Sequence, residues 1–437
     1  MPNEKPSFKE AFWFWLKLGF ISFGGPAGQI AIMHEFLVEK KKWISESRFL
    51  HTLNYTMLLP GPEAQQLATY TGWLIHGTKG GLVAGIFFVL PSMFILFGLS
   101  ALYASFGNIP WVYAMFNGLK PAVMAIVLLA LIKIGKKSLY HAFHYLLAGS
   151  AFILMYFFEV PFPSIIFGAL AVALILRPLF PQLFEATPSA KEQLSKNEDE
   201  YYINRHHYLE GSGFKVSRIG RQVLTALLLW FIPYVLFYTF SSDFVFWKQL
   251  TFFFTKAAFV TFGGAYAVLP YVAQVSVEKL NWLTELQMID GLALGETTPG
   301  PLVMVLVFVG FMAGYNHFGE SVLMGGLGLL TTTFYTFLPC FLFIFVGAPI
   351  IEKTRENEKI KQALTLVTAA VVGVILNLTI YLAKAIIFPE EVSRAGIDYL
   401  TLSWICISFL ALYRFKINMI TWIGFSAIFG LLHYFLM

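Results

Sequence analysis

The chain has 437 residues, of which 57% are hydrophobic and only 13% charged, and its mean hydropathy is +0.69. This composition excludes a soluble domain of such length and predicts a polytopic membrane protein. The formal charge of +5 fits the usual excess of Lys and Arg in loops on one side of a membrane, and it does not indicate a protein that binds nucleic acid.

Helices are expected to carry the fold. The sequence contains about a dozen apolar stretches of the roughly 20 residues that a spanning helix needs. Runs such as "LVAGIFFVLPSMFILFGLSALY" show no alternation, which excludes a transmembrane barrel. The fold class predicted is therefore an all-α polytopic membrane protein. The first apolar run, from Ala11, lacks a small-residue cleavage site, so we interpret it as a retained segment.

The two halves of the chain repeat each other. "SFGGPAGQIAIMHEFLVEKKKW" begins at Ser22 and "TFGGAYAVLPYVAQVSVEKLNW" at Thr261, an offset of 239 residues. After an insertion of nine residues in the second half, the register resumes with an offset of 248. The same offsets align further matched pairs: Lys17 with Lys256, Pro60-Gly61-Pro62 with Pro299-Gly300-Pro301, and Leu90-Pro91 with Leu338-Pro339. This pattern indicates an internal repeat.

Four segments follow from this repeat: an N-terminal transmembrane repeat at 1–177, a cytoplasmic linker at 178–221, an extra linking helix at 222–245 and a C-terminal repeat at 246–437. The linker is polar and mixed in charge, and its His206-His207 pair has no third metal ligand nearby. One extra crossing between the repeats turns the second upside down, so we expect two inverted-topology repeats.

The number of spans stays open between two alternatives. Most Lys and Arg residues fall on one side, which we interpret as the cytoplasm. Lys40, Lys41 and Lys42 are the exception if residues 11–33 cross fully. The alternatives are thirteen full spans, or nine spans with re-entrant hairpins at the glycine and Pro-Gly-Pro segments.

Broken or re-entrant helices are predicted at four places. In "SFGGPAGQ" a helix stops at Gly24-Gly25 and restarts with Pro26. Such a helix start presents unpaired N–H groups and about half a positive charge, which suits an anion. The "LLPGPEAQQ" and "TTPGPLVMV" segments break in the same way, and we expect the breaks to converge near the midplane. Close helix packing is the alternative explanation, but in-register repetition favours a substrate site.

Charged residues near the breaks complete the candidate site. Lys17 and Lys256 each precede their glycine pair by seven residues, and each either meets an anion or extends to a lipid headgroup. Glu63 follows one break and either pairs with a lysine or carries a proton. The predicted substrate-binding residues are Lys17, Ser22, Gly24, Gly25, Gln29, Pro60, Gly61, Pro62, Glu63, Gln66, Lys256, Thr261, Gly263, Gly264, Glu296, Thr298, Pro299, Gly300 and Pro301.

Enzymatic chemistry is not predicted. "HEFLVEK" begins like a zincin helix, but Val38 stands where the second histidine is required. Cys340 and Cys406 lie in apolar runs without partners at metal-ligand spacing. Neither a phosphate-binding loop nor a nucleophile elbow occurs, so we expect no cofactor, no metal and no catalytic residue.

The words "FGGPAGQIAIMHEF", "LLPGPEAQQLATYTGWLIHG", "TFGGAYAVLPYVAQ" and "ETTPGPLVMVLVFVGF" resemble the chromate ion transporter family, in its long two-repeat form. The resemblance covers nearly the whole chain outside the linker. It implies an exporter of chromate in the bacterial inner membrane, with sulfate as a competing substrate and a homodimer as a candidate assembly. An interior-negative potential of 100 mV would drive a dianion outward with about 4.6 kcal/mol.

Three other functions compete with this hypothesis. An oxyanion uptake carrier would share every feature but must work against the membrane potential, so it would depend on a cation gradient. An intramembrane enzyme acting on lipid phosphates should show a base or metal cluster, and none emerges from the sequence. A structural scaffold has no reason to break its helices twice in register.

Overall fold

The computed structural model describes residues 5–23, 25–57, 59–107, 109–176, 200–204, 215–262, 264–351, 358–388 and 396–436. Within these residues the regular elements are helices, apart from one isolated bridge between Ile44 and Ile203. The all-α prediction is therefore confirmed. Most of the predicted linker, with His206 and His207, lies outside the described residues.

The helices occur in the same order in both halves. The first half contains α1 Phe8–Ile21, α2 Gly25–His34, the π-helix η1 Glu35–Lys40, α3 Glu46–Thr56, α4 Glu63–Phe106, α5 Pro110–Ser138, α6 Ala142–Phe158 and α7 Phe162–Leu176. Helix α8, Val216–Phe240, follows. The second half contains α9 Phe244–Val260, α10 Ala265–Ala273, the π-helix η4 Gln274–Lys279, α11 Glu285–Thr297, the 3-10 helix η5 Leu302–Met304, α12 Val305–His317, α13 Val322–Ile351, α14 Glu358–Ile387, α15 Tyr399–Tyr413 and α16 Met419–Leu436.

Six helices of the described chain are long and apolar enough to cross a membrane, and they lie in α4, α5, α8, α13, α14 and α16. Shorter apolar segments of 10–17 residues lie in α6, α7, α12 and α15. The protein is thus a polytopic membrane protein, as predicted. Helix α8 begins six residues before the predicted boundary at 222, because its first turns carry polar side chains such as Arg218 and Arg221.

The repeats correspond element by element. The π-helices η1 and η4 begin at residues 35 and 274, which gives the sequence offset of 239. Helices α5 and α14 end at 138 and 387, which agrees within one residue with the later offset of 248. Non-helical φ/ψ values at His76 and Gly77 divide α4 into two parts that correspond to α12 and α13. The equivalent helices α3 and α11 even begin alike, since Ser45 and Thr284 each accept a hydrogen bond from a backbone N–H in the first turn.

Helices α1 and α2 form a hairpin whose two ends meet. The Lys41 ammonium, just past η1, lies 2.7 Å from a carboxylate oxygen of Glu10 in the first turn of α1. The ring centroids of Phe14 and Trp43 lie 5.0 Å apart. The chain therefore turns at residues 22–25 and returns to the side where it began. This segment is a re-entrant hairpin and not a full span.

Helix α3 and the first part of α4 form a second hairpin on the same side. The Nε2 atom of His76 lies 2.9 Å from the carbonyl oxygen of Pro6, which precedes α1. The His76 ring also packs edge-on against Phe8, with centroids 5.4 Å apart. Both hairpins of the first repeat thus open toward the side that holds Pro6, Lys41 and His76, which we call the N side.

The second repeat closes its hairpins in the same manner. Nε2 of His317, the last residue of α12, lies 2.7 Å from a carboxylate oxygen of Asp243, the N-cap of α9. The hydrogen bond with His317 holds the pKa of the Asp243 carboxyl below its ordinary value. The Phe246 ring stacks on His317 and also contacts Trp282, next to η4. These hairpins open on what we call the far side.

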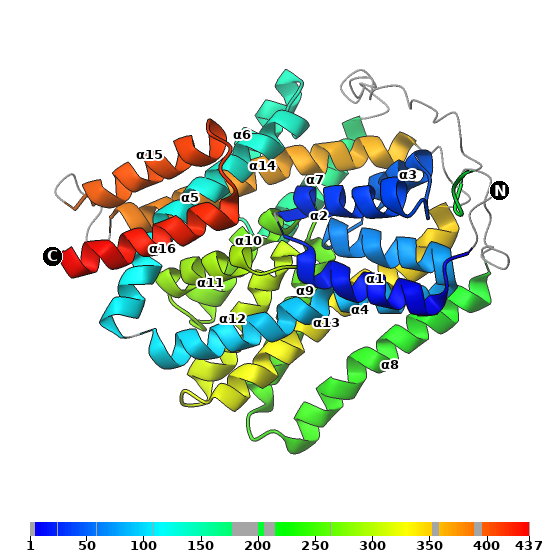
Figure 1. Ribbon diagram of the computed structural model, residues 1–437, viewed down its shortest axis with the longest axis horizontal. Coiled ribbons are helices and arrows are strands. Elements are labelled where there is room, and N and C mark those ends of the chain that lie inside the picture. Colours follow the sequence, from blue (N-terminus) through cyan, green and yellow to red (C-terminus); the bar gives the residue numbers. More distant parts are fainter. Residues whose placement is uncertain are drawn as a thin grey trace.

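The re-entrant alternative therefore holds over thirteen full spans. The segments of the described chain left to cross are the second part of α4, α5, α6, α7, α8, α13, α14, α15 and α16. Five of them, from α4 to α8, separate the two sets of hairpins, and an odd number of crossings inverts the second repeat. Figure 1 shows the termini at opposite ends of the long axis, with α1 and α3 toward the N-terminal end and α10 and α11 toward the other.

The two repeats also exchange their last helices. Helices α6 and α7 pack on α14 of the second repeat, whereas α15 and α16 pack on α5 of the first. At one such contact, Gly118 of α5 and Gly430 of α16 face each other closely enough that a side chain at either would meet backbone atoms. The apolar core is therefore shared across the repeats, which holds the two sets of hairpin tips against one another.

Candidate functional site

The four breaks meet in two reciprocal backbone contacts. The N–H of Gly61 donates to the carbonyl oxygen of Thr261 at 2.7 Å, and the N–H of Gly300 donates to that of Ser22 at 2.8 Å. Ser22 and Thr261 are repeat equivalents, as are Gly61 and Gly300. Each Pro-Gly-Pro segment thus docks against the glycine break of the other repeat, and the predicted convergence is observed. Because hairpins from opposite sides meet here, the contact lies inside the membrane.

Two of the predicted ligands are occupied by their own helices. The Ser22 hydroxyl donates to the Leu18 carbonyl oxygen at 2.6 Å, and the Thr261 hydroxyl donates to that of Ala257 at 2.6 Å. Both residues are buried where α1 and α9 end. These side chains satisfy carbonyl groups that the break leaves without helical partners, so their observed role is to end the helices.

The Pro-Gly-Pro segments are tightly packed. At Gly61, with a φ of +126°, an added Cβ would lie 2.7 Å from the Gln66 amide and 2.8 Å from the Cys340 sulfur. At Gly300, with a φ of +91°, it would lie 2.9 Å from Ser92. Ser92 and Cys340 are themselves repeat equivalents. Close packing, the alternative weighed for the glycines, therefore describes these two segments.

Side-chain amides and hydroxyls fix the same segments. Gln66 donates to the Pro60 carbonyl oxygen at 2.7 Å, Gln29 donates to that of Gly300, and Ser92 to that of Pro299. Thr298 donates to the Gly295 carbonyl oxygen at 3.0 Å. Pro62 and Pro301 stand one position before the helical turns that follow, as N-cap residues.

The glycine breaks border more open space. At Gly25, with a φ of +67°, an added Cβ would find no heavy atom of the described residues within 4 Å. At Gly264, with a φ of +90°, the nearest atom is a Glu63 carboxylate oxygen at 3.8 Å. Gly24 and Gly263 lie outside the described residues. Helices α2 and α10 begin at these positions, so their unpaired N–H groups face the part of the site with room for a ligand.

Two carboxylates from different repeats lie at the start of α10. Glu63 opens α4 beside Gly264, and the buried Glu296 in the last turn of α11 accepts a hydrogen bond of 2.6 Å from the Tyr266 hydroxyl. Their repeat equivalents are Leu302 and Met57, which carry no charge. The backbone of the site is therefore symmetric, but its charge is not.

The structure does not bring Lys17 and Lys256 into this cluster. Both side chains are exposed, and Nζ of Lys17 lies 6.0 Å from the centroid of the Phe36 ring. This placement fits the alternative in which these lysines extend toward lipid headgroups.

Two other lysines, both in α5, lie near the carboxylates of the site, where Lys17 and Lys256 were expected. Lys137 of α5 is close enough to Glu63 for their charges to interact, and Lys133 is in the same relation to Glu296. Both lysines are exposed and lie toward the N-side end of α5. They stand four residues apart on one face of α5, and this spacing is the signal in the sequence that could have indicated them.

Unsatisfied polar atoms surround the breaks. The side-chain carbonyl oxygens of Gln29, Gln65 and Gln66 are buried and have no hydrogen-bond partner among the described residues. Buried polar atoms without partners are costly, so a polar ligand or water is expected beside them. In the described part of the chain, no group of three His, Cys, Asp or Glu side chains is placed to hold a metal ion.

A second charged cluster lies outside the breaks, and sequence reasoning missed it. Lys120 of α5 and Asp290 of α11 are both buried, with Nζ 3.8 Å from a carboxylate oxygen. Tyr103 donates to the other oxygen of Asp290 at 2.9 Å, and Lys120 donates to Asn117 at 2.8 Å. This cluster ties α11 of the second repeat to α4 and α5 of the first.

An inverted-repeat helical membrane protein with broken helices at its centre has the architecture of a secondary transporter. The chain belongs to the chromate transporter family, because the family model described as Chromate transporter matches residues 9–175 and 248–431. These two matched regions correspond to the two repeats, and the linker and α8 lie between them. The resemblance found in the sequence is thus confirmed.

Named relatives agree with this assignment. The chain is 27% identical to a probable chromate transport protein of Synechococcus elongatus, over 91% of this chain and 90% of the relative. It is 29% identical to chromate transport proteins of Cupriavidus metallidurans, over 86% and 83% of the two chains, and of Pseudomonas aeruginosa, over 95% and 89%. No solved structure matches this chain.

Proposed function

We propose that the protein is a secondary transporter, not an enzyme, that exports chromate from the bacterial cytoplasm by alternating access. The observation that carries the proposal is the meeting of four helix breaks in two reciprocal contacts, Gly61 with Thr261 and Gly300 with Ser22. The starts of α2 and α10 supply unpaired N–H groups for a tetrahedral oxyanion, and the space beside Gly25 and Gly264 receives it. The names of the relatives support chromate as the substrate.

Lysine and carboxylate groups set the charge of this site. Lys133 and Lys137 compensate Glu296 and Glu63 when the site is empty, and they turn to the dianion when it arrives. The two helix starts add about half a positive charge each. In the empty site the lysines and carboxylates thus neutralise one another, so no isolated buried charge is present before the dianion arrives.

The positions of the basic residues support transport out of the cytoplasm. With re-entrant hairpins, Lys40 to Lys42 lie on the N side, as do the ends of α5 and α15 with Lys137 and Arg414. A side rich in Lys and Arg corresponds to the cytoplasm, here of the bacterial inner membrane. Lys40, Lys41 and Lys42 therefore agree with the rule that Lys and Arg gather on the cytoplasmic side.

The far side lacks the lysines of the N-side approach. Tyr381 stands at the repeat position of Lys133 and Ala385 at that of Lys137. Glu278 and Glu285, whose charges act on Tyr381, by contrast repeat Glu39 and Glu46 of the N side. Glu159, between α6 and α7, acts on Glu278 as well. Lysines at the cytoplasmic approach, without counterparts outside, favour loading of an anion from within.

Transport into inside-out vesicles tests the direction. In such vesicles the N side faces the medium, so chromate should accumulate inside and should do so faster when the lumen is made electrically positive. An electrical gradient alone should suffice, because outward movement of a dianion is favoured by the potential. Uptake that requires a sodium or proton gradient and ignores the potential would contradict export of this kind and would point to the uptake carrier.

A further inference from the structure

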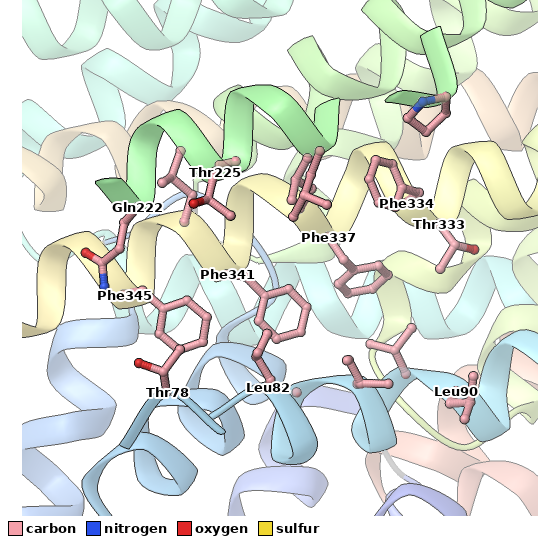
Figure 2. A pocket seen from close by; sticks show the side chains of 18 of the residues that line it. Thr78, Leu82, Leu90, Gln222, Thr225, Thr333, Phe334, Phe337, Phe341 and Phe345 are labelled. Carbon is pink, nitrogen blue, oxygen red and sulfur yellow. The ribbon is translucent and has the colours of Figure 1, made fainter. Parts of the chain in front are cut away.

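Helix α8 lies at the edge of the protein. None of its residues is buried, and it packs on α13 and α9. A groove of about 1030 Å³ lies between α8 and the surface formed by α4 and α13. Figure 2 shows α8 along one edge of this groove and α4 along the other, with Phe337, Phe341 and Phe345 of α13 between them.

Most of the groove is apolar. Phenylalanine side chains of α13 point toward Leu82 of α4, and Leu90 and Phe334 continue the lining at the end away from Gln222 (Figure 2). A hydrated dianion would lose its solvation there without compensation, so the groove is no path for the substrate. Within a bilayer a surface of this kind is covered by hydrocarbon.

The opposite end of the groove is polar and basic. Arg218, Arg221, Gln222 and Thr225 reach it from the first turns of α8, across from Thr78. Neither guanidinium pairs with a carboxylate in the part of the chain that the structure describes. The side-chain carbonyl oxygen of Gln222 is buried and has no hydrogen-bond partner among the residues that the structure describes. The start of a helix of 25 residues adds partial positive charge at this end.

This basic end lies at the membrane surface of the N side. Thr78 lies two residues after His76, and His76 contacts Pro6 where the hairpins open. From Gln222 to Phe237 the groove extends over about 22 Å at 1.5 Å per residue, which exceeds half of a bilayer core about 30 Å thick. The groove therefore begins at the depth of phospholipid headgroups and ends beyond the tips of the acyl chains in that leaflet.

We propose that this groove binds one anionic phospholipid of the N-side leaflet. Its phosphate lies between Arg218 and Arg221, where guanidinium groups can donate two parallel hydrogen bonds. One acyl chain lies along Phe345, Phe341 and Phe337 and fills the space between α8 and α4. The lipid thereby holds α8, which has no buried residue of its own, against the transporter.

Native mass spectrometry of the full chain in detergent, incubated with phosphatidylglycerol or phosphatidylcholine, tests the proposal. The parent should retain phosphatidylglycerol in preference. Arg218→Gln with Arg221→Gln should weaken that retention about 25-fold, since each basic group near an anionic lipid contributes about fivefold. The matched control is Arg414→Gln with Lys416→Gln, a pair of exposed basic residues on the same side but outside the groove, and it should retain the lipid like the parent.

A second pair of variants tests the position of the acyl chain. Ala226 lines the groove, whereas Leu228 is exposed on α8 and does not. Ala226→Trp should displace the lipid with the arginines intact, and Leu228→Trp should not. Retention by Ala226→Trp, or equal retention of both lipids by the parent, would overturn the proposal. Cross-linking of two copies through Ala226→Cys would overturn it too, because a second chain would then fill the groove.

Discussion

The two repeats share a backbone and differ in charge. The contact of Gly61 with Thr261 and that of Gly300 with Ser22 are the same interaction made twice. The charged side chains of the site differ between the repeats, since Glu63 corresponds to Leu302 and Lys133 to Tyr381. The repeated backbone therefore builds the site, and the side chains that are not repeated give it a direction.

The repeated backbone and the charges that are not repeated serve different purposes. A two-fold related pair of breaks is needed so that hairpins from opposite sides meet without leaving backbone groups unpaired in the membrane. A carrier with identical charges on both approaches would load an anion equally well from either side. Lys133 and Lys137 on the N side, which correspond to Tyr381 and Ala385 on the far side, remove that equivalence.

The largest effect is expected from the shared backbone. Gly61→Ala and Gly300→Ala should each cost about 3 kcal/mol or more, because the new Cβ clashes with the other repeat at a positive φ. Both variants should lose monodisperse protein in size-exclusion chromatography. Gly25→Ala, also at a positive φ but beside open space, should cost roughly 1–2 kcal/mol and keep the fold. Unequal losses at Gly61 and Gly300 would show that the two backbone contacts are not equivalent.

A comparable effect is expected at a buried ion pair that only one of the two repeat positions carries. Lys120→Met leaves Asp290 buried without its cation, and the loss of one partner of a buried pair costs about 3–5 kcal/mol. The midpoint of thermal unfolding should therefore be lower for the variant than for the parent. Lys120→Met combined with Asp290→Leu should recover most of the loss. If the double variant is no better than the single one, the pair does not act as a unit.

The smallest effect is expected at the pair of Asp243 and His317, where α9 begins and α12 ends. The depressed pKa of Asp243 means that its pairing with His317 stabilises the fold above the ordinary value of 3.8 and is lost as the pH falls through the folded-state pKa. The site is partly exposed, so Asp243→Asn should lower the free energy of unfolding by less than about 1 kcal/mol. Thermal midpoints of parent and variant should differ slightly at pH 7 and converge in acid. A difference that grows in acid would contradict this assignment.

Much of the fold could be predicted from the sequence, because the repeated Gly-Gly and Pro-Gly-Pro motifs reveal the offset between the two repeats. The sequence could not decide between re-entrant hairpins and full spans, since that choice depends on long-range contacts such as that of Lys41 with Glu10. The candidate site was predicted less well. Apolar surroundings made Lys17 and Lys256 look internal, whereas the packing of α5 in the shared core, invisible to local patterns, places Lys133 and Lys137 near the carboxylates.

Chromate uptake into inside-out vesicles by two double variants tests the central claim most directly. Lys133→Gln with Lys137→Gln should reduce the rate at least tenfold, which corresponds to about 1.4 kcal/mol, at equal amounts of folded protein. Lys17→Gln with Lys256→Gln should transport within about twofold of the parent, a difference of less than about 0.5 kcal/mol. Full activity of the first pair, together with loss in the second, would contradict the asymmetric site described for this transporter.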